Sequence, residues 1–169
     1  LQDGDEITAE FVPTGTALFI VKDGDGKEYY SLDDAIAAAQ AANKTVVVVK
    51  QSGALYTNDK ELTNGKYEFT IPAGITLLVP GDAAYTVQNN GVTSAEVTDA
   101  ASSSLFRKLA LLPNTSIIAN GNICVYSKLS NHMGDNGRPY QYGQIEMGTD
   151  CKITMKSGST LTAYGYISG

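Results

Sequence analysis

An alanine-rich stretch that passes directly into four valines is the clearest pattern in the chain. It reads YYSLDDAIAAAQAANKTVVVV over residues 29–49. Its apolar residues recur at three- and four-residue spacing, as on one face of a helix. Ser31 followed by Asp34 is close to a capping box, and Asn43 is a residue that readily takes the left-handed conformation at a helix end. We therefore predict a short amphipathic helix that begins at Leu32.

Strand signals lie on both sides of this helix. The run Thr45–Val49 shows no alternation of apolar and polar residues, which is typical of a strand buried on both faces in a parallel sheet. Before the helix, Ala17–Lys22 is apolar and β-branched, Asp23–Gly26 reads DGDG, and Lys27–Tyr30 returns. This order predicts a β-hairpin with a tight turn.

Three later segments resemble one another and indicate an internal repeat. They read GITLLVPG from Gly74, NTSIIANG from Asn114 and DCKITMKSG from Asp150. Each has an apolar residue three positions on and a glycine seven or eight positions on, and each then resumes as another short strand. The aligned apolar residues are Leu77, Ile117 and Ile153, the glycines are Gly81, Gly121 and Gly158, and the second strands are Tyr85–Gln88, Ile123–Tyr126 and Thr160–Tyr164.

Such short strands, separated by Gly, Asn and Pro, favour an all-β fold of the parallel solenoid type, in which each coil covers the one below. A β-sandwich is the alternative. It would require alternating inward and outward residues along most strands. The segment Phe69–Val79, FTIPAGITLLV, is apolar almost throughout, and Pro72 and Gly74 mark a bend within it. The solenoid is therefore the preferred prediction.

The segment ALFIVKDGDGKEYYSLDDAIAAA, followed further on by FTIPAGITLLVPGD, resembles the beginning of a right-handed parallel β-helix of the pectate-lyase-like superfamily. More narrowly, it resembles a module of large bacterial surface proteins that carries the pattern Y-x-S/T-L-x-x-A-I/V-x-A-A. The resemblance covers residues 17–81. With the repeats, it implies a linker or N-terminal extension at 1–16, a hairpin and capping helix at 17–43, and β-helix coils at 44–169 that are truncated at their C-terminal end.

The same resemblance implies a secreted or cell-surface location and two functional hypotheses. The first is a noncatalytic structural or adhesive module that binds glycans or host surfaces. The second is the N-terminal part of a polysaccharide lyase or glycoside hydrolase, because the fold alone does not fix the function. An open last coil would also expose strand edges and apolar surface, so we expect self-association through it.

Composition narrows the range of partners. Charged residues make up 18% of the chain and the net charge is −6, whereas an average globular chain has about 25% charged residues. Nucleic acids and anionic membranes require clustered Lys and Arg, and the 12 basic residues here are scattered. Because the chain has no run of eighteen apolar residues, we expect no membrane-spanning helix.

A polar and aromatic segment, YSKLSNHMGDNGRPYQY at Tyr126–Tyr142, lies between two of the aligned units. We expect it to form a long loop, and loops on a rigid scaffold frequently carry binding residues. Tyrosine faces could stack on sugar rings while the polar groups bond hydroxyls. No catalytic residue is predicted, because the acids after Glu96 form no recurring pair. The candidate ligand-binding residues are His132, Asp135, Arg138, Tyr140 and Tyr142.

Two smaller groups of residues have both a functional and a structural interpretation. Asp23, Asp25 and Glu28 resemble part of a calcium loop, but the bidentate acid twelve positions along is missing, so a hairpin turn is the better interpretation. No other cofactor is expected. Cys124 and Cys151 fall at different positions of the aligned units, so we expect two free, buried thiols and no disulfide.

Overall fold

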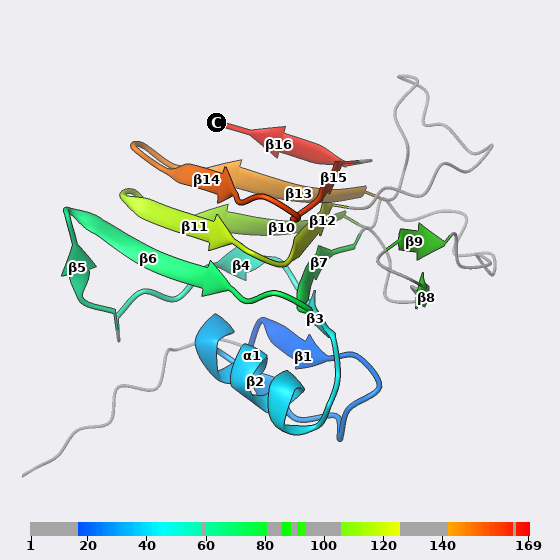
Figure 1. Cartoon of the computed structure of the whole chain (residues 1–169). Coiled ribbons are helices and arrows are strands. Elements are labelled where there is room, and N and C mark those ends of the chain that lie inside the picture. Colours follow the sequence, from blue (N-terminus) through cyan, green and yellow to red (C-terminus); the bar gives the residue numbers. More distant parts are fainter. Residues whose placement is uncertain are drawn as a thin grey trace, which may run out of the picture.

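The computed structural model describes residues 17–58, 60–80, 86–88, 91–93, 106–125, 142–163 and 165–169. The predicted extension at 1–16 lies outside these residues. The described part is mostly β-strand with parallel sheets and contains one helix (Figure 1), as the prediction of a β-rich chain with parallel strands required. The elements are β1 (Phe19–Val21), β2 (Glu28–Tyr29), α1 (Leu32–Ala41), β3 (Val46–Val49), β4 (Gly53–Ala54), β5 (Leu62–Thr63), β6 (Lys66–Ile71), β7 (Thr76–Val79), β8 (Thr86–Gln88), β9 (Gly91–Thr93), β10 (Phe106–Leu111), β11 (Thr115–Ala119), β12 (Asn122–Val125), β13 (Tyr142–Met147), β14 (Lys152–Met155), β15 (Leu161–Ala163) and β16 (Tyr166–Ser168).

Three sheets contain all of these strands except β8 and β9, which pair with each other. Sheet A has the order β15-β12-β7-β3-β1-β2, sheet B the order β16-β13-β10-β4, and sheet C the order β14-β11-β6-β5. From β3 onward the chain visits the sheets repeatedly in the same order, A, then B, then C. The first pass contributes β3, β4 and both β5 and β6, the next two passes add one strand to each sheet, and the last adds β15 and β16 to sheets A and B. The strands added by each later pass pair in parallel with those of the pass before. Antiparallel pairing in the three sheets joins β1 to β2 and to β3, and β5 to β6.

The hairpin and helix at the N-terminal side form as predicted. Strands β1 and β2 pair antiparallel, with Phe19 opposite Tyr29. Helix α1 begins at Leu32, and the Ser31 Oγ accepts a hydrogen bond of 3.2 Å from the backbone N–H of Asp34. Asn43 has a φ of 53°, the left-handed conformation expected just after the helix. These local signals were strong because each depends only on neighbouring residues.

Loss of the helix cap is expected to destabilise the protein measurably. The Ser31→Ala variant should lower the free energy of unfolding by about 1 kcal/mol, because the N–H of Asp34 loses its acceptor. Urea denaturation followed by circular dichroism measures this, with Ser157→Ala in an exposed turn as the control. If Ser31→Ala were no more destabilising than the control, the cap would contribute nothing to the fold.

The core consists of side chains that occupy equivalent positions in successive strands. In sheet C, Phe69, Ile117 and Ile153 lie opposite one another on neighbouring strands. Sheet A has Leu77, Ile123 and Leu161 in the same relation, and sheet B has Leu109, Ile145 and Ile167. The first two members of each row are 0–1% exposed. We term these the core rows.

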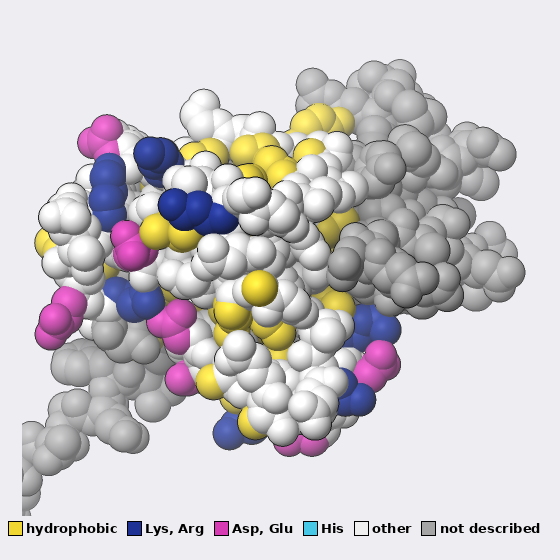
Figure 2. All heavy atoms as spheres, viewed as in Figure 1, with side chains coloured by type: hydrophobic (Ala, Val, Ile, Leu, Met, Phe, Trp, Pro, Cys, Tyr) yellow, Lys and Arg dark blue, Asp and Glu magenta, His cyan; other side chains and the backbone are white. Residues whose placement is uncertain are grey.

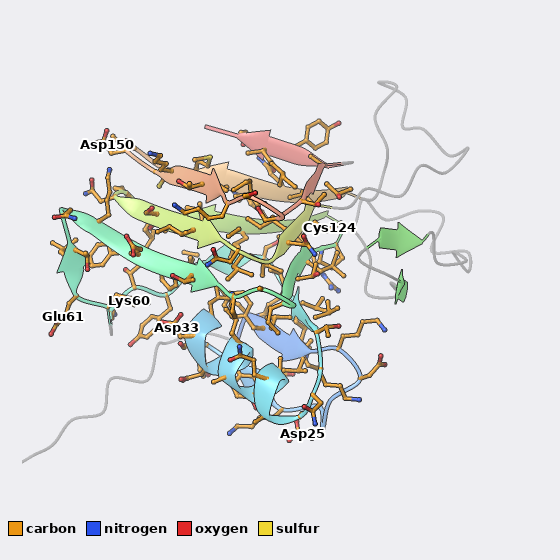
Figure 3. All side chains as sticks on the ribbon, in the orientation of Figure 1. Asp25, Asp33, Lys60, Glu61, Cys124 and Asp150 are labelled. Atoms are coloured by element: carbon orange, nitrogen blue, oxygen red, sulfur yellow. The ribbon has the colours of Figure 1, made fainter. Side chains whose placement is uncertain are left out.

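Helix α1 covers one end of this core. Its buried residues Leu32, Ala35, Ile36 and Ala39 belong to the same apolar cluster as the core rows. Lys60 attaches its first turn to the sheets, since the Lys60 Nζ lies 2.5 Å from the Asp33 carboxylate (Figure 3) and 4.4 Å from the centre of the Phe69 ring. In Figure 1, α1 and β1 lie at one end of the molecule and β14 to β16 at the other. The interpretation of the helix as a cap is supported by this packing.

One part of the predicted repeat is wrong. Ile117 does lie opposite Ile153, as aligned. However, Ile117 lies opposite Phe69 and not Leu77, whose partner is Ile123. A turn followed by an apolar strand recurs at several corners of each pass, so the first unit was aligned one strand too late. The segment FTIPAGITLLV accordingly supplies two strands in different sheets, with the bend at Gly74, whose φ is 84°.

Candidate functional site

The connection from sheet A to sheet B differs greatly in length from one pass to the next. In one pass the chain leaves β7 at Val79 and enters β10 at Phe106, and in the next it leaves β12 at Val125 and enters β13 at Tyr142. Val79 is paired with Val125, and Phe106 with Tyr142. Two long segments, 80–105 and 126–141, are therefore inserted at the same place in successive passes. We term this the A–B corner.

The following pass makes the same crossing with two residues. Strand β15 ends at Ala163 and β16 begins at Tyr166. Gly165 donates its backbone N–H to the carbonyl of Val125 at 3.0 Å. A Cβ at this position would lie 2.2 Å from the carbonyl oxygen of Gly143, which is far too close. The short crossing thus depends on glycine, and it demonstrates that neither long segment is needed to connect the two sheets.

The predicted ligand-binding residues belong to the second inserted segment. His132, Asp135, Arg138 and Tyr140 lie outside the described residues. Tyr142 is the first residue of β13 and pairs with Phe106, so its assignment to the predicted loop is wrong. This boundary was missed because Tyr142 was grouped with the tyrosines before it, whereas the alternation in YGQIEM indicates a strand.

Beside the A–B corner, the outer face of sheet B presents polar and aromatic side chains. The residues pointing inward along β10 and β13, such as Leu109 and Ile145, are fully buried, so the alternate residues lie on the outer face. Neighbouring strands place Lys108, Gln144 and Tyr166 in one row, and Ala110, Glu146 and Ser168 in the next. We term Lys108, Gln144, Glu146, Tyr166 and Ser168 the sheet B surface.

An ion pair and a hydrogen bond link four members of the sheet B surface. The Lys108 Nζ lies 3.1 Å from a carboxylate oxygen of Glu146. The Gln144 Nε2 donates to the Ser168 Oγ at 2.7 Å. Tyr166 is 38% exposed. Such a surface offers an aromatic side chain for stacking together with groups that bond hydroxyls, which is the chemistry that a sugar requires.

Sequence reasoning missed the sheet B surface because its members are contributed by three separate strands. The available signal was the alternation of apolar and polar residues in FRKLAL and YGQIEM, which indicates one buried and one exposed face. Which strands are neighbours, however, follows from the order of passes and not from local composition.

Among the described strands of sheet B, Glu146 is the single acidic residue. Glycoside hydrolysis ordinarily requires two carboxylates facing each other across the sugar.

The three acids proposed for calcium each have another partner. The Asp23 carboxylate lies 2.8 Å from the Lys22 Nζ, and the hydrogen bond and charge of Lys22 lower the pKa of Asp23. Asp25, at the hairpin turn in Figure 3, accepts the backbone N–H of Lys27 at 2.9 Å. Glu28 forms an ion pair with Lys50. Within the described ranges, no three His, Cys, Asp or Glu side chains are grouped so as to hold a metal ion.

Both cysteines are free thiols, but their environments differ. Cys124 is 4% exposed and packs with Val46, Val48 and Leu78, and burial raises the pKa of its thiol to about 12. Cys151 is only half-buried, which corrects the expectation of two buried thiols, and its Sγ donates to the Leu112 carbonyl oxygen at 3.0 Å. Cys124 should therefore be chemically inert in the folded protein, because the thiolate is the reactive species.

This difference predicts selective alkylation. At pH 8, iodoacetamide should leave Cys124 unmodified in the folded protein, since its raised pKa keeps the thiol protonated and burial blocks access. In urea, Cys124 should be modified at the rate of an ordinary thiol. Peptide mass spectrometry after a timed reaction gives the extent of modification at each cysteine. Modification of Cys124 in the native state, without loss of structure, would contradict its place in the core.

Comparison with known proteins found no matching family model, curated protein or solved structure. In the part of the chain that the structure describes, no helix is long and apolar enough to cross a membrane.

Proposed function

We propose that this chain is a noncatalytic structural and adhesive module of a secreted bacterial surface protein, built as a right-handed parallel β-helix. Repeated passes through sheets A, B and C, with core rows continuing from pass to pass, support the β-helix. In this proposal the scaffold displays the two segments inserted at the A–B corner, together with the sheet B surface. Its partners are extracellular glycans or glycan-bearing host surfaces.

The observation that carries the proposal is the difference in length between the connections that successive passes make at the A–B corner. Two residues, 164 and 165, suffice to connect the sheets in the last pass. The longer insertions are therefore not needed for the connection, and long insertions between the elements of a rigid scaffold are where binding residues concentrate. The candidate ligand residues His132, Asp135, Arg138 and Tyr140 all lie in the second insertion.

A binding function fits the sheet B surface better than a catalytic one. Tyr166 is partly exposed beside groups that bond hydroxyls, whereas Glu146 is already paired with Lys108. Stacking on an aromatic ring and hydrogen bonding to hydroxyls require no shifted pKa and no second carboxylate. The net charge of −6 disfavours polyanionic partners and leaves neutral glycans as the preferred class.

The proposal is tested by shortening the second insertion. Residues 126–141 are replaced by Tyr-Gly, the two residues that make the crossing in the last pass. We expect this variant to fold with an unchanged circular dichroism spectrum and to lose binding on a glycan array. A second variant, Tyr166→Ala, should weaken binding at least tenfold, and Thr70→Ala on the exposed face of sheet C should leave binding unchanged.

Two outcomes would overturn the proposal. If the intact protein binds no glycan on a broad array, the adhesive part fails. If it releases unsaturated products from an acidic polysaccharide when calcium is added, the module is catalytic and belongs with the polysaccharide lyases.

A further inference from the structure

Two Asn-Gly steps lie within the described residues, Asn64–Gly65 and Asn120–Gly121. An asparagine that precedes glycine readily loses its side-chain amide, because the backbone nitrogen of the next residue attacks that amide and glycine has no Cβ to obstruct the approach. The two steps therefore share one chemistry. Their surroundings in the fold decide which of them reacts.

Asn64 and Gly65 form the turn of the hairpin between β5 and β6. They are the two residues between Thr63 and Lys66, which pair with each other, and their φ angles are 51° and 76°. Two positive φ angles are typical of the tight hairpin turn that favours Asn-Gly. Both residues are exposed. Among the described residues, the backbone N–H of Gly65 donates to no backbone carbonyl.

This hairpin can open without disturbing the core. Strand β5 ends the order of sheet C on the side of β6, and two residue pairs join it to β6. Leu62 is 58% exposed, and Thr63 is exposed as well. In Figures 1 and 2 the hairpin lies at the left margin of the molecule, where no other described element covers it. A segment with so few buried apolar contacts opens locally at low free-energy cost.

The second step is held in place on several sides. Gly121 is buried, and its backbone N–H donates to the Ile71 carbonyl oxygen at 3.0 Å. A Cβ on Gly121 would lie 2.1 Å from the Ile75 carbonyl oxygen, which shows how closely the backbone of the preceding pass approaches. For its nitrogen to attack the Asn120 amide, this hydrogen bond must break and the two passes must separate.

We propose that Asn64 is a site of spontaneous deamidation in the folded protein, whereas Asn120 keeps its amide. The backbone nitrogen of Gly65 loses its proton to solvent and attacks the Asn64 Cγ. An N–Cγ bond forms, the Cγ–Nδ2 bond breaks, and the leaving nitrogen takes up a proton and departs as ammonia. Water then opens the resulting succinimide at either carbonyl and gives aspartate or isoaspartate. The reaction consumes water and involves no oxidation or reduction.

The two products alter the hairpin to different extents. Aspartate adds a negative charge at residue 64. Isoaspartate also lengthens the backbone by one methylene, so the turn can no longer set Thr63 opposite Lys66, because loop length fixes the register of a hairpin. The core rows stay in place, since β5 contributes no residue to them. The inference goes beyond the proposed function, because it concerns this hairpin and not the A–B corner.

The test is incubation of the intact protein in mildly alkaline buffer, followed by peptide mapping with tandem mass spectrometry. Trypsin releases residues 61–66, ELTNGK, in which Asn64 is the single asparagine. Asn90 and Asn136 also precede glycine, but they lie outside the described residues and in other tryptic peptides. In the native protein we expect Asn64 to deamidate at least tenfold faster than Asn120. In urea the two rates should become similar, because neither step is then held by the fold.

The matched control is Asn64→Gln, which keeps an amide but places it one methylene too far for the same ring to form readily. Its 61–66 peptide should stay unmodified over the same time. Circular dichroism during the incubation establishes that the protein remains folded. An Asn64 amide that lasts as long as that of Asn120 in the native protein would overturn the proposal. A tenfold difference that persists in urea would overturn it too, since neighbouring residues and not the fold would then set the rates.

Discussion

Replacement of Gly121 by alanine is expected to lower the free energy of unfolding by about 3 kcal/mol or more. Gly121 lies in the turn between β11 and β12, directly against the preceding turn between β6 and β7. A Cβ on Gly121 would lie 2.1 Å from the carbonyl oxygen of Ile75 and 2.3 Å from that of Pro72. Both atoms belong to backbone, so they cannot move aside without separating the two passes.

The matched control is Gly158→Ala, in the corresponding turn one pass later. Gly158 has a φ of 84°, but a Cβ there meets no atom within 4 Å. Alanine at Gly158 should therefore cost only the strain of the left-handed conformation, about 1 kcal/mol. Thermal unfolding should show a decrease of roughly 10 °C for Gly121→Ala and about a third of that for the control. Equal decreases for the two variants would mean that the turn containing Gly121 is not in close contact with the turn between β6 and β7.

Alanine substitutions at different positions of one core row should lower the free energy of unfolding by different amounts, depending on the pass. Ile117→Ala is expected to lower the free energy of unfolding by about 3–4 kcal/mol, because Ile117 is fully buried between Phe69 and Ile153. Ile153→Ala makes the same chemical change in β14, the last strand of sheet C in the described structure, where the side chain is only half-buried. Its cost should be about 1 kcal/mol, since less apolar area returns to water.

Urea denaturation, fitted with a shared m-value, measures the free energy of unfolding of both variants. The isosteric variant Ile117→Leu is the control, because it changes residue 117 without removing side-chain volume. Two variants of equal stability would show that Ile117 and Ile153 do not occupy an inner and an outer position of one row. The two residues match in residue type, sheet and register position, and they differ in the pass to which they belong.

The sequence was sufficient for those parts of the fold that neighbouring residues determine. The cap at Ser31, the turn at Asp23–Gly26 and the buried valines of β3 each produce a local signal, and each prediction was confirmed. The bend at Gly74 was identified in the same way. Strand pairing is different, because Ile117 pairs with residues 48 and 36 positions away, Phe69 and Ile153. Several similar turns occur in the sequence, so more than one alignment of the strands is compatible with it.

The candidate site was less predictable for the same reason. The tyrosine-rich insertion before Tyr142 is visible as composition, and it was predicted as a loop. The sheet B surface exists only because β10, β13 and β16 become neighbours, which brings Lys108 to Glu146 and Gln144 to Ser168. No local pattern contains that information. The parallel pairs of the structure align Lys108 with Gln144 and Tyr166, and Glu146 with Ser168, whereas the turns alone do not.

The central claim is that successive passes stack in parallel with a defined register, and a distance between spin labels tests it most directly. Glu68 and Lys152 are exposed and both lie opposite Ser116, on its two sides. Their Cα atoms should be separated by two strand spacings, about 10 Å. Labels attached at Glu68→Cys and Lys152→Cys, with Cys124 and Cys151 replaced by alanine and serine, should show strong dipolar broadening compared with the two single-labelled proteins. A spectrum equal to the sum of the single-labelled spectra would contradict the parallel stacking.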